Sequence, residues 1–322
     1  MNIDMIRAAA KRIDGFAQRT PLLTSRFLDA IAGRRVWVKP ECLQHTGSFK
    51  FRGAYSALSA MDEKTRACGV IAFSSGNHAQ GVALAAKMHG TNAVIIMPSD
   101  APALKIANTK AYGAEVVLYD RTTESRDEIG ARLSEERGLT LVKPFDDPQV
   151  IAGQGTCGLE IAEDANALGI KNADVIVCCG GGGLTSGIAL ALEADAPTLR
   201  VRPAEPAGFD DVARSLRAGK IERNPSLSGN ICDAIITPQA GDLTWPHLHR
   251  LCGPGLVVSE DEVLDAMAQA FLRLKVVAEP GGAAALAAAL SRKDEIESED
   301  VIVTISGGNV DPAMFARALE RL

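Results

Sequence analysis

The segment Gly47-Ser48-Phe49-Lys50-Phe51-Arg52-Gly53-Ala54 places one lysine between two aromatic residues, shortly after the apolar stretch Val36-Trp37-Val38. An ammonium group held against apolar surface loses hydration, so its pKa falls and the free amine becomes a nucleophile and a base. The alternative from this segment alone is a lysine at a helix start, whose stem packs on the core while its head reaches water. Lys50 is therefore a candidate catalytic residue.

A second unusual segment is the glycine run Gly180-Gly181-Gly182-Gly183-Leu184, which follows an apolar stretch and precedes a helical pattern. Consecutive glycines let backbone N–H groups turn toward one point at the positive end of a helix dipole, which makes a cradle for an anion. The dinucleotide pattern G-x-G-x-x-G fails here, and no G-x-x-x-x-G-K-[ST] segment exists. A purely structural tight turn is the alternative.

Two serine-containing segments also stand at predicted strand ends, where ligands of α/β sheets bind. In Ser74-Ser75-Gly76-Asn77-His78, hydroxyls and free N–H groups at a helix start suit a substrate carboxylate, and an ordinary capping loop is the alternative. In Ser306-Gly307-Gly308-Asn309, the hydroxyl of Ser306 can point into a pocket, and a simple strand-end serine is the alternative.

Composition excludes several classes of partner. The 322 residues carry a net charge of -6 from 34 basic and 40 acidic residues, without long blocks of one sign, so neither nucleic acid nor an anionic membrane is expected. The start lacks a secretory signature, and no apolar run approaches the roughly 20 residues of a membrane span. The seven cysteines form no C-x-x-C pair, which indicates buried thiols. We expect a cytoplasmic protein with a small-molecule partner.

The hydrophobic pattern predicts an α/β fold with two sheets. Strands alternating with helices favour βαβ units and mainly parallel sheets flanked by helices. We expect a large domain formed by residues 1–68 and 146–322, and a small inserted domain formed by residues 69–145. The expected strands are 36–39, 70–73, 93–97, 116–119, 175–178, 199–201 and 301–305. The expected helices are 4–16 capped by Asp4, one after Lys50 capped by Ser48, 77–88, 104–112, 158–168, 185–192, 260–276 and one from 281.

Taken together and in this order, the segments around Lys50, Ser75, the glycine run and Ser306 resemble those of the fold-type II pyridoxal-phosphate enzymes. Within that group the chain resembles the threonine/serine dehydratase and serine racemase branch, over nearly its whole length. The resemblance implies a two-lobed fold similar to the tryptophan synthase β-subunit. It implies that pyridoxal 5'-phosphate is the cofactor and that Lys50 holds it as a Schiff base.

The same resemblance assigns further contacts to the cofactor and substrate. Residues Gly180, Gly181, Gly182, Gly183 and Leu184 would hold the phosphate, Phe49 would pack on one ring face, Asn77 would contact the ring hydroxyl and Ser306 would face the pyridine nitrogen. Ser74, Ser75, Gly76 and Asn77 would grip the substrate carboxylate, with His78 shaping that loop. Glu279 would lie near the substrate amine or leaving group.

The resemblance also assigns two further sites, a substrate contact and a cation site, and each has an alternative interpretation. Arg126 lies near where racemase-like members carry an arginine that can meet a second carboxylate, and a surface charge is the alternative. Glu205, Asp211 and the carbonyl of Phe209 resemble the divalent-cation loop of the family, for Mg²⁺, Ca²⁺ or Mn²⁺, and a solvated acidic turn is the alternative. The chain departs from the family at Asp233-Ala234, where Asp-Gly is common, which leaves the substrate-side wall undefined.

The functional prediction is an ammonia-lyase that converts L-threonine or L-serine to a 2-keto acid and ammonia, working as a homodimer or higher homo-oligomer. A neutral hydroxyl at the pyridine nitrogen favours elimination over transamination. The alternatives are a serine racemase that uses Ser75 on the second cofactor face, and a 3-hydroxyaspartate dehydratase. A binding protein without turnover is a further alternative, against which the presence of Lys50, Ser75 and Ser306 argues.

Overall fold

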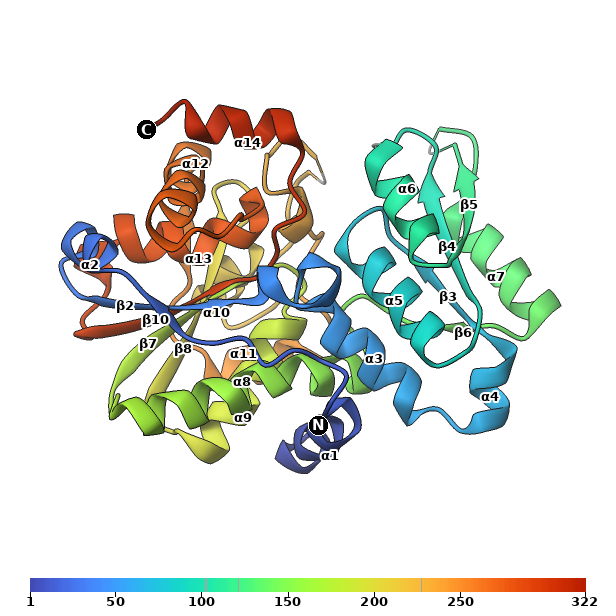
Figure 1. The fold of residues 1–322 in the computed structure, drawn as a ribbon, viewed down its shortest axis with the longest axis horizontal. Helices are drawn as coiled ribbons and strands as arrows, with labels where there is room; N and C mark the ends of the chain where they lie inside the picture. Colours follow the sequence, from blue (N-terminus) through green and yellow to red (C-terminus); the bar gives the residue numbers. More distant parts are fainter. Residues whose placement is uncertain (102, 121, 227) are drawn as a thin grey trace.

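Two β-sheets organise the chain into two lobes, as Figure 1 shows. The computed structural model describes residues 1–101, 103–120, 122–226 and 228–322. Among the described residues, no helix is both long and apolar enough to cross a bilayer. The α/β fold class predicted from the sequence is confirmed.

The sheet of the large lobe has six strands in the order β1-β2-β10-β7-β8-β9. All neighbouring pairs are parallel except β1 with β2, which forms an antiparallel edge. Two central strands (β7 and β10) are mainly apolar, as expected when both faces of a parallel sheet are covered. The bounds are β1 Leu23–Thr24, β2 Arg35–Pro40, β7 Ala173–Cys178, β8 Leu199–Pro206, β9 Leu256–Val258 and β10 Asp300–Ile305.

Helices cover both faces of this sheet. Val175 and Val177 of β7 face a cluster with α8 and α9, whereas Ile176 and Cys178 face a cluster with α12 and α13, because side chains alternate along a strand. Figure 1 shows these two helix pairs on opposite sides of the sheet. The helices are α1 Ile3–Ile13, α2 Arg26–Ala32, α3 Lys50–Ala60, α8 Pro148–Leu168, α9 Gly183–Asp195, α10 Asp211–Ala218, α11 Trp245–Leu251, α12 Glu260–Gln269, α13 Pro280–Ser291 and α14 Pro312–Leu319. Short turns of helix are η1 Glu41–Leu43, η2 His45–Gly47, η3 Asp233–Ile235, η4 Ala270–Leu274 and η5 Lys293–Glu295.

The small lobe holds a four-stranded parallel sheet in the order β5-β4-β3-β6. The predicted ranges 70–73, 77–88, 93–97, 104–112 and 116–119 match the observed elements within one residue, whereas α4, α7 and β6 had no predicted range. Helices α3 and α5 cover one face and α7 the other. The bounds are β3 Val70–Phe73, β4 Ala93–Pro98, β5 Glu115–Tyr119, β6 Thr140–Leu141, α4 Glu63–Cys68, α5 Asn77–Met88, α6 Ala103–Ala111 and α7 Arg126–Arg137. Because α3 packs on both α5 and α8, the domain limits at 69 and 145 stay a prediction.

The first predicted helix is wrong at both ends. Helix α1 begins at Ile3, because Asn2 Oδ1 accepts a hydrogen bond of 3.1 Å from Met5 N and so caps it instead of Asp4. It ends at Ile13, because Asp14 has a non-helical ψ of 132°. Phe16 therefore lies outside the helix and is 44% exposed.

Ser48 does not cap the helix that starts at Lys50. Phe49 precedes that helix in a helical conformation, and the Ser48 hydroxyl is buried without a hydrogen-bond partner. The extended backbone of Ser48 instead forms an antiparallel bridge with Gly307. The Lys50 segment is thus tied to the segment that follows β10, the last strand in the sequence.

Two other predicted helices have different limits. Helix α8 begins ten residues earlier than predicted, where Asp147 Oδ1 accepts from Gln149 N and Val150 N. Its glycines disfavour helix in the sequence, but they allow close packing, since a Cβ at Gly153 would lie 2.5 Å from Arg52 O. The predicted helix 260–276 ends earlier, because η4 is a π-helical turn followed by Lys275 at φ 63°.

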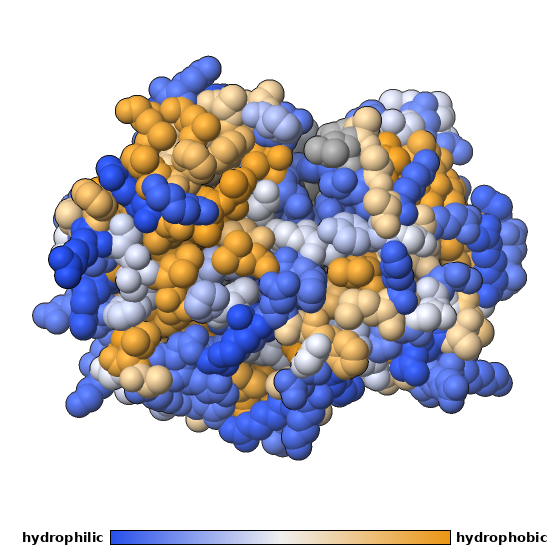
Figure 2. Space-filling model, viewed as in Figure 1, coloured by the Kyte–Doolittle hydropathy of each residue, from blue (hydrophilic) through white to orange (hydrophobic). Residues whose placement is uncertain are grey.

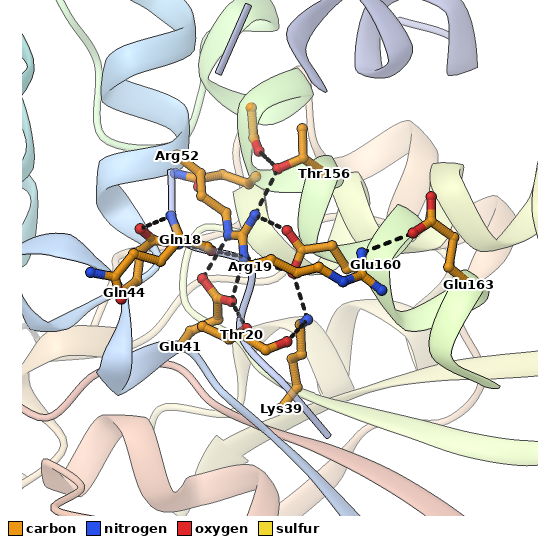
Figure 3. A network of polar contacts seen from close by, with 12 residues as sticks. Gln18, Arg19, Thr20, Lys39, Glu41, Gln44, Arg52, Thr156, Glu160 and Glu163 are labelled. Carbon is orange, nitrogen blue, oxygen red and sulfur yellow. Dashed lines mark hydrogen bonds and ion pairs between the residues drawn. The ribbon is translucent and has the colours of Figure 1, made fainter. Parts of the chain in front are cut away.

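A buried network of charges joins α3 to its neighbours, as Figure 3 shows. Arg52 donates from Nε and Nη2 to both carboxylate oxygens of Glu41, at 2.7 and 2.8 Å, and from Nη1 to Glu160 at 2.6 Å. Lys39 Nζ donates to the other oxygen of Glu160 at 2.6 Å and to Thr20 O. Two cations thus balance two anions, and burial alone would lower the pKa of Arg52, but Glu41 and Glu160 raise it well above its usual range.

We expect Arg52→Met to lower the free energy of unfolding by about 3 to 5 kcal/mol, because it leaves buried carboxylates without their counter-charge. Arg52→Lys should cost less, since a lysine keeps the charge but loses the bidentate contact. Arg7→Met is the control: Arg7 pairs with Asp195 at 2.6 Å but is 52% exposed, so its loss should cost about 1 kcal/mol or less. Denaturant unfolding measures all three variants. Equal losses for Arg52→Met and Arg7→Met would contradict the prediction.

Candidate active site

One cavity between the lobes, with a volume of about 230 Å³, collects most of the residues selected from the sequence. The lobes contribute both walls, since parallel strands of each sheet end there. Predicted residues that line it are Phe49, Lys50, Ser74, Ser75, Gly76, Asn77, His78, Gly180, Gly181, Gly182, Gly183, Leu184, Glu279 and Ser306.

Lys50 stands at the first position of α3 and points its amine into this cavity. Its Nζ donates a hydrogen bond of 2.8 Å to Pro144 O and lies 5.2 Å from the centre of the Phe49 ring. Burial lowers the pKa of Lys50 to about 8, although the carboxylate of Glu279 opposes this shift. A neutral amine is thus accessible near physiological pH, as nucleophilic chemistry requires.

The glycine run forms a tightly packed loop at the start of α9. This loop, Gly180–Leu184, is called the anion bed below. Gly182 has φ +90°, and a Cβ at Gly181 would lie 2.3 Å from Phe145 Cε2, so side chains are excluded at both positions. The first bond of the helix runs from Ser186 N to Gly182 O at 2.8 Å. The N–H groups before Ser186 therefore lack intrahelical acceptors and are suited to an anion.

The loop from Ser74 to His78 leads from β3 into α5. Ser74 Oγ accepts a hydrogen bond of 3.1 Å from Gly76 N, which holds the turn. His78 Nε2 lies 2.9 Å from Val142 O, and since a carbonyl only accepts, this nitrogen carries the proton. Burial and then the charge of Lys50 lower the pKa of His78 to about 3, so the imidazole stays neutral. This position agrees with a residue that shapes the loop.

Asn77 is held from two sides. Its Nδ2 donates to Glu279 Oε1 at 2.6 Å, and its Oδ1 accepts from Asn309 Nδ2 at 2.7 Å. Burial raises the pKa of Glu279 to about 7, while the bond from Asn77 lowers it. Asn309 also donates to Thr46 O. Nothing in the sequence segment that contains Asn309 predicts this contact.

Ser306 directly follows β10, beside the Lys50 segment. Its carbonyl accepts from Phe49 N at 3.1 Å, and its own N–H donates to Gly282 O at 3.2 Å. The following Gly307 has no room for a side chain, because a Cβ there would lie 1.9 Å from Glu279 Oε1. The predicted strand-end serine therefore has a fixed backbone at the cavity wall.

Several buried polar atoms of lining residues lack hydrogen-bond partners, which indicates that the cavity is built for a polar ligand. They are Thr185 Oγ1, whose neighbour is the weakly polar thiol of Cys179, and Gln154 Nε2, His78 Nδ1 and Thr237 Oγ1. Together with the anion bed and the Lys50 amine, these atoms fit a phosphorylated cofactor that carries an aldehyde, such as pyridoxal 5'-phosphate.

The structure does not bring Arg126 to this cavity. Arg126 lies at the start of α7, is 57% exposed and has Asp127 as a distant partner at 3.8 Å. The lining instead includes Lys105 of α6 and Asp233 of η3, whose charged atoms lie 3.1 Å apart. Sequence reasoning missed Lys105, because a lysine inside an ordinary helix gives no signal.

The predicted cation loop lies away from the cavity lining. The two oxygens of Glu205 accept from Val212 N and Ala213 N, so Glu205 already serves the start of α10. Asp211 Oδ1 accepts from Asn224 at 2.6 Å, whereas its Oδ2 is buried without a partner. Burial raises the pKa of Asp211 to about 6. Among the described residues no group of three or more His, Cys, Asp or Glu side chains could hold a metal, so a cation here would need carbonyl ligands such as that of Phe209.

We expect Lys50 of the unliganded protein to titrate with a midpoint near pH 8, its neutral fraction rising with pH. Glu279→Gln should move this midpoint to lower pH, because it removes the negative charge that raises the pKa of Lys50. Glu63→Gln, on the exposed face of α4, should leave it unchanged. Isotope-edited NMR of the lysine side chains measures the three titrations, and a Lys50 midpoint above pH 10 would contradict the burial argument.

Comparison with known proteins identifies the family. The family model described as "Pyridoxal-phosphate dependent enzyme" matches residues 13–308. An L-threo-3-hydroxyaspartate ammonia-lyase of Pseudomonas sp is 45% identical over 317 residues, covering 98% of both chains. A serine racemase of Oryza sativa subsp. indica is 43% identical, covering 99% of this chain and 94% of its own. The crystal structure of T.th. threonine deaminase has a TM-score of 0.91 at 44% identity, covering 97% of this chain and 99% of that one. The chain therefore belongs to the fold-type II pyridoxal-phosphate dependent enzymes that include serine racemases, threonine deaminases and 3-hydroxyaspartate ammonia-lyases.

Proposed function

We propose that this protein is a pyridoxal-phosphate dependent ammonia-lyase that converts L-threonine or L-serine to a 2-keto acid and ammonia. The observation that carries the proposal is the Lys50 amine, with its pKa lowered to about 8, in one cavity with an anion bed and the Ser74–His78 loop. Lowered basicity makes this amine both a nucleophile and a base near neutral pH.

Several groups in the cavity would bind the cofactor in this proposal. Lys50 would hold the cofactor, and the N–H groups of Gly180–Leu184 would bind its phosphate. Asn77 would meet the ring hydroxyl, Ser306 the ring nitrogen and Phe49 one ring face. When bound, the cofactor supplies an electron sink for negative charge at the substrate Cα.

The substrate-side groups hold the amino acid and move its protons. N–H groups and hydroxyls of Ser74–Asn77 at the start of α5 would bind the α-carboxylate. The Lys50 amine would take the Cα proton, and the β-hydroxyl would gain a proton and leave as water. Water that adds at Cα would then release ammonia and give the 2-keto acid. Glu279, whose pKa of about 7 makes both of its protonation states available, would lie near the amine or the leaving group.

A racemase is the second candidate function, because Ser75 lines the same cavity as Lys50. A racemase needs a proton-transfer group on each face of the substrate Cα, and Ser75 would serve the face opposite Lys50. One relative named above is a serine racemase, whereas the other two carry ammonia-lyase or deaminase names. We rank elimination first because it requires only one of the two proton transfers.

We also propose that the protein works as a homodimer. Exposed apolar side chains gather on the large lobe: Phe27 of α2 stacks on Arg273, and Phe271 packs against Phe315 of α14. Figure 2 shows a hydrophobic area on this part of the surface. Apolar patches of this kind on a monomer are typical of association surfaces.

Product analysis tests the proposed reaction. L-Threonine or L-serine should yield 2-keto acid and ammonia in equal amounts, and Lys50→Ala should abolish both the visible absorption of the bound cofactor and this turnover. Loss of a positioned base alone costs roughly 10²- to 10⁴-fold, and loss of the covalent link adds to it. Lys64→Ala, with its exposed side chain, should keep both properties.

Chiral chromatography of the same reactions ranks the two candidate functions. In an ammonia-lyase, Ser75→Ala retains much of the turnover of the L-substrate and loses any D-serine formation. D-Serine forming faster than pyruvate from L-serine, with Ser75→Ala blocking only D-serine, would make the protein a racemase.

A divalent cation at Glu205, Asp211 and the carbonyl of Phe209 should stabilise the fold. A ligand that binds only the folded state adds roughly 2.7 kcal/mol at a hundredfold excess over Kd. Chelation should therefore lower the Tm of the wild type, while the Tm of Asp211→Asn should not respond to chelator or cation. A wild-type Tm that chelation leaves unchanged removes the cation from the proposal.

A further inference from the structure

Asn309 is not among the residues that line the cavity, but its side chain contacts one that does. Asn309 follows β10 in the large lobe, whereas Asn77 begins α5 of the small lobe and lines the cavity. Asn309 Nδ2 donates to Asn77 Oδ1 and to Thr46 O, at 2.7 Å in both cases. The cofactor and substrate contacts proposed above do not use Asn309, so these two bonds need another explanation.

A single backbone carbonyl determines how both amides are turned. Thr46 O can only accept a hydrogen bond, so the Asn309 atom that contacts it is the nitrogen of the NH2 group. The same NH2 group contacts Asn77, so the Asn77 atom beside it is the amide oxygen. The NH2 group of Asn77 therefore lies on the other side, where it donates to Glu279 Oε1 at 2.6 Å. The orientation of the Asn77 amide thus follows from the Thr46 carbonyl through Asn309.

The Thr46 carbonyl belongs to a strained part of the backbone. Thr46 has a φ of 61°, in the left-handed region that β-branched residues rarely adopt, and such strain persists only where the surrounding structure enforces it. At the next residue, Gly47, a Cβ would lie 2.7 Å from Asn309 Oδ1, so the Asn309 side chain packs directly on this backbone. Gly308 N also donates to Gly47 O at 2.9 Å. The segment before Lys50 and the segment that carries Asn309 are therefore held together.

The orientation of Asn77 leaves a donor for a ligand in the cavity. The NH2 group carries two hydrogens, and Glu279 accepts one of them. Nδ2 lies at the cavity wall, where a Cβ at Gly307 would lie 3.0 Å from it. Hydrogen bonds from an N–H to an ionised oxygen are stronger than those to a neutral hydroxyl. A cavity that presents this N–H therefore favours a ligand with an ionised oxygen at that point.

We propose that Asn309 is a positioning residue that turns the Asn77 amide so that an N–H, and not an oxygen, faces the ring hydroxyl of the cofactor. This contact favours the ionised form of that hydroxyl. The inference rests on the proposed function, from which the contact between Asn77 and the ring hydroxyl is taken. A structural brace between the two lobes is the competing explanation of the Asn309 bonds.

Equilibrium binding to the protein freed of its cofactor distinguishes the two explanations. Pyridoxine 5'-phosphate and 3-deoxypyridoxine 5'-phosphate differ in the ring hydroxyl alone, and neither carries an aldehyde that reacts with Lys50. Asn309→Asp keeps the size of the side chain but replaces its NH2 group by oxygen, so Asn77 should turn its own oxygen toward the cavity. Calorimetry should show that the preference for pyridoxine 5'-phosphate over the deoxy ligand falls roughly 10- to 100-fold, as expected for a hydrogen bond to a charged group.

Two further variants separate the donor from the added charge. Asn309→Leu has no charge and removes both donated bonds, so Asn77 can adopt either orientation and the preference should fall by a smaller factor. Asn172→Asp, at an exposed position, adds the same charge as Asn309→Asp and should leave the preference unchanged. Because the preference is a ratio of two dissociation constants, a general loss of phosphate binding does not alter it.

The ultraviolet absorption of bound pyridoxine 5'-phosphate gives a second measurement, because it changes when the ring hydroxyl ionises. The pH midpoint of this change should be higher in Asn309→Asp and Asn309→Leu than in the wild type, since the donor that stabilises the ionised form is lost. The titratable side chains that line the cavity are the same in all of these proteins, namely Lys50, His78, Lys105, Cys178, Asp233 and Glu279.

The outcomes separate the inference from the proposed function. Equal weakening of both ligands with an unchanged midpoint would identify a brace and overturn the inference, as would a wild type that binds the two ligands equally well. Neither measurement needs a reaction. A wild type that shows the expected preference but no ammonia-lyase turnover would therefore reject the proposed function and support the role of Asn309.

Discussion

The contact between the Arg52 guanidinium and the carboxylates of Glu41 and Glu160 is the constraint on which the site depends. Arg52 lies two residues after Lys50 on α3, and its bidentate bond to Glu41 fixes the start of that helix against η1. Glu160 ties the same point to α8, and Lys39 ties it to β2. A buried network of this kind is stable only while every charge keeps its partner. The Lys50 amine is thereby held at one place between two lobes.

Within the cavity, burial works on an acid and a base in opposite directions. It lowers the pKa of Lys50 to about 8 and raises that of Glu279 to about 7, so the two values approach each other. Desolvation disfavours the charged form of both groups. Proton exchange near neutral pH then needs little free energy, which suits a reaction that both removes and returns protons. Asn77, which is itself held by Asn309, donates to the Glu279 carboxyl group and keeps it in place.

The family, the fold class and most of the cavity were predictable from sequence, because they depend on local signals. Apolar runs placed the buried strands, and the glycine run and the Ser74–His78 loop follow such runs at the edge where ligands bind. The features that were not predictable depend on contacts between segments that lie far apart in the sequence. The first half of α8 was not predicted, because its glycines lower the helix propensity of the sequence. In the structure these glycines allow α8 to pack closely on α3. Lys105 enters the cavity only because α6 of one lobe faces η3 of the other. The resemblance implied a substrate contact for Arg126, which the structure places on the exposed start of α7, outside the cavity lining.

Two parts of the cavity, a crowded floor of glycines and a more open rim, differ in how well they can tolerate substitutions. Any side chain at Gly181 or Gly307 would overlap Phe145 or Glu279, so the floor of the cavity has no spare volume at these positions. The rim is different, because Asp233 is largely exposed and its neighbour Ala234 is small. Substitutions there meet solvent rather than packed atoms, and most surface changes alter stability little. Substitutions at the rim can therefore change the shape and charge of the cavity mouth while the packed glycine positions of the floor stay as they are.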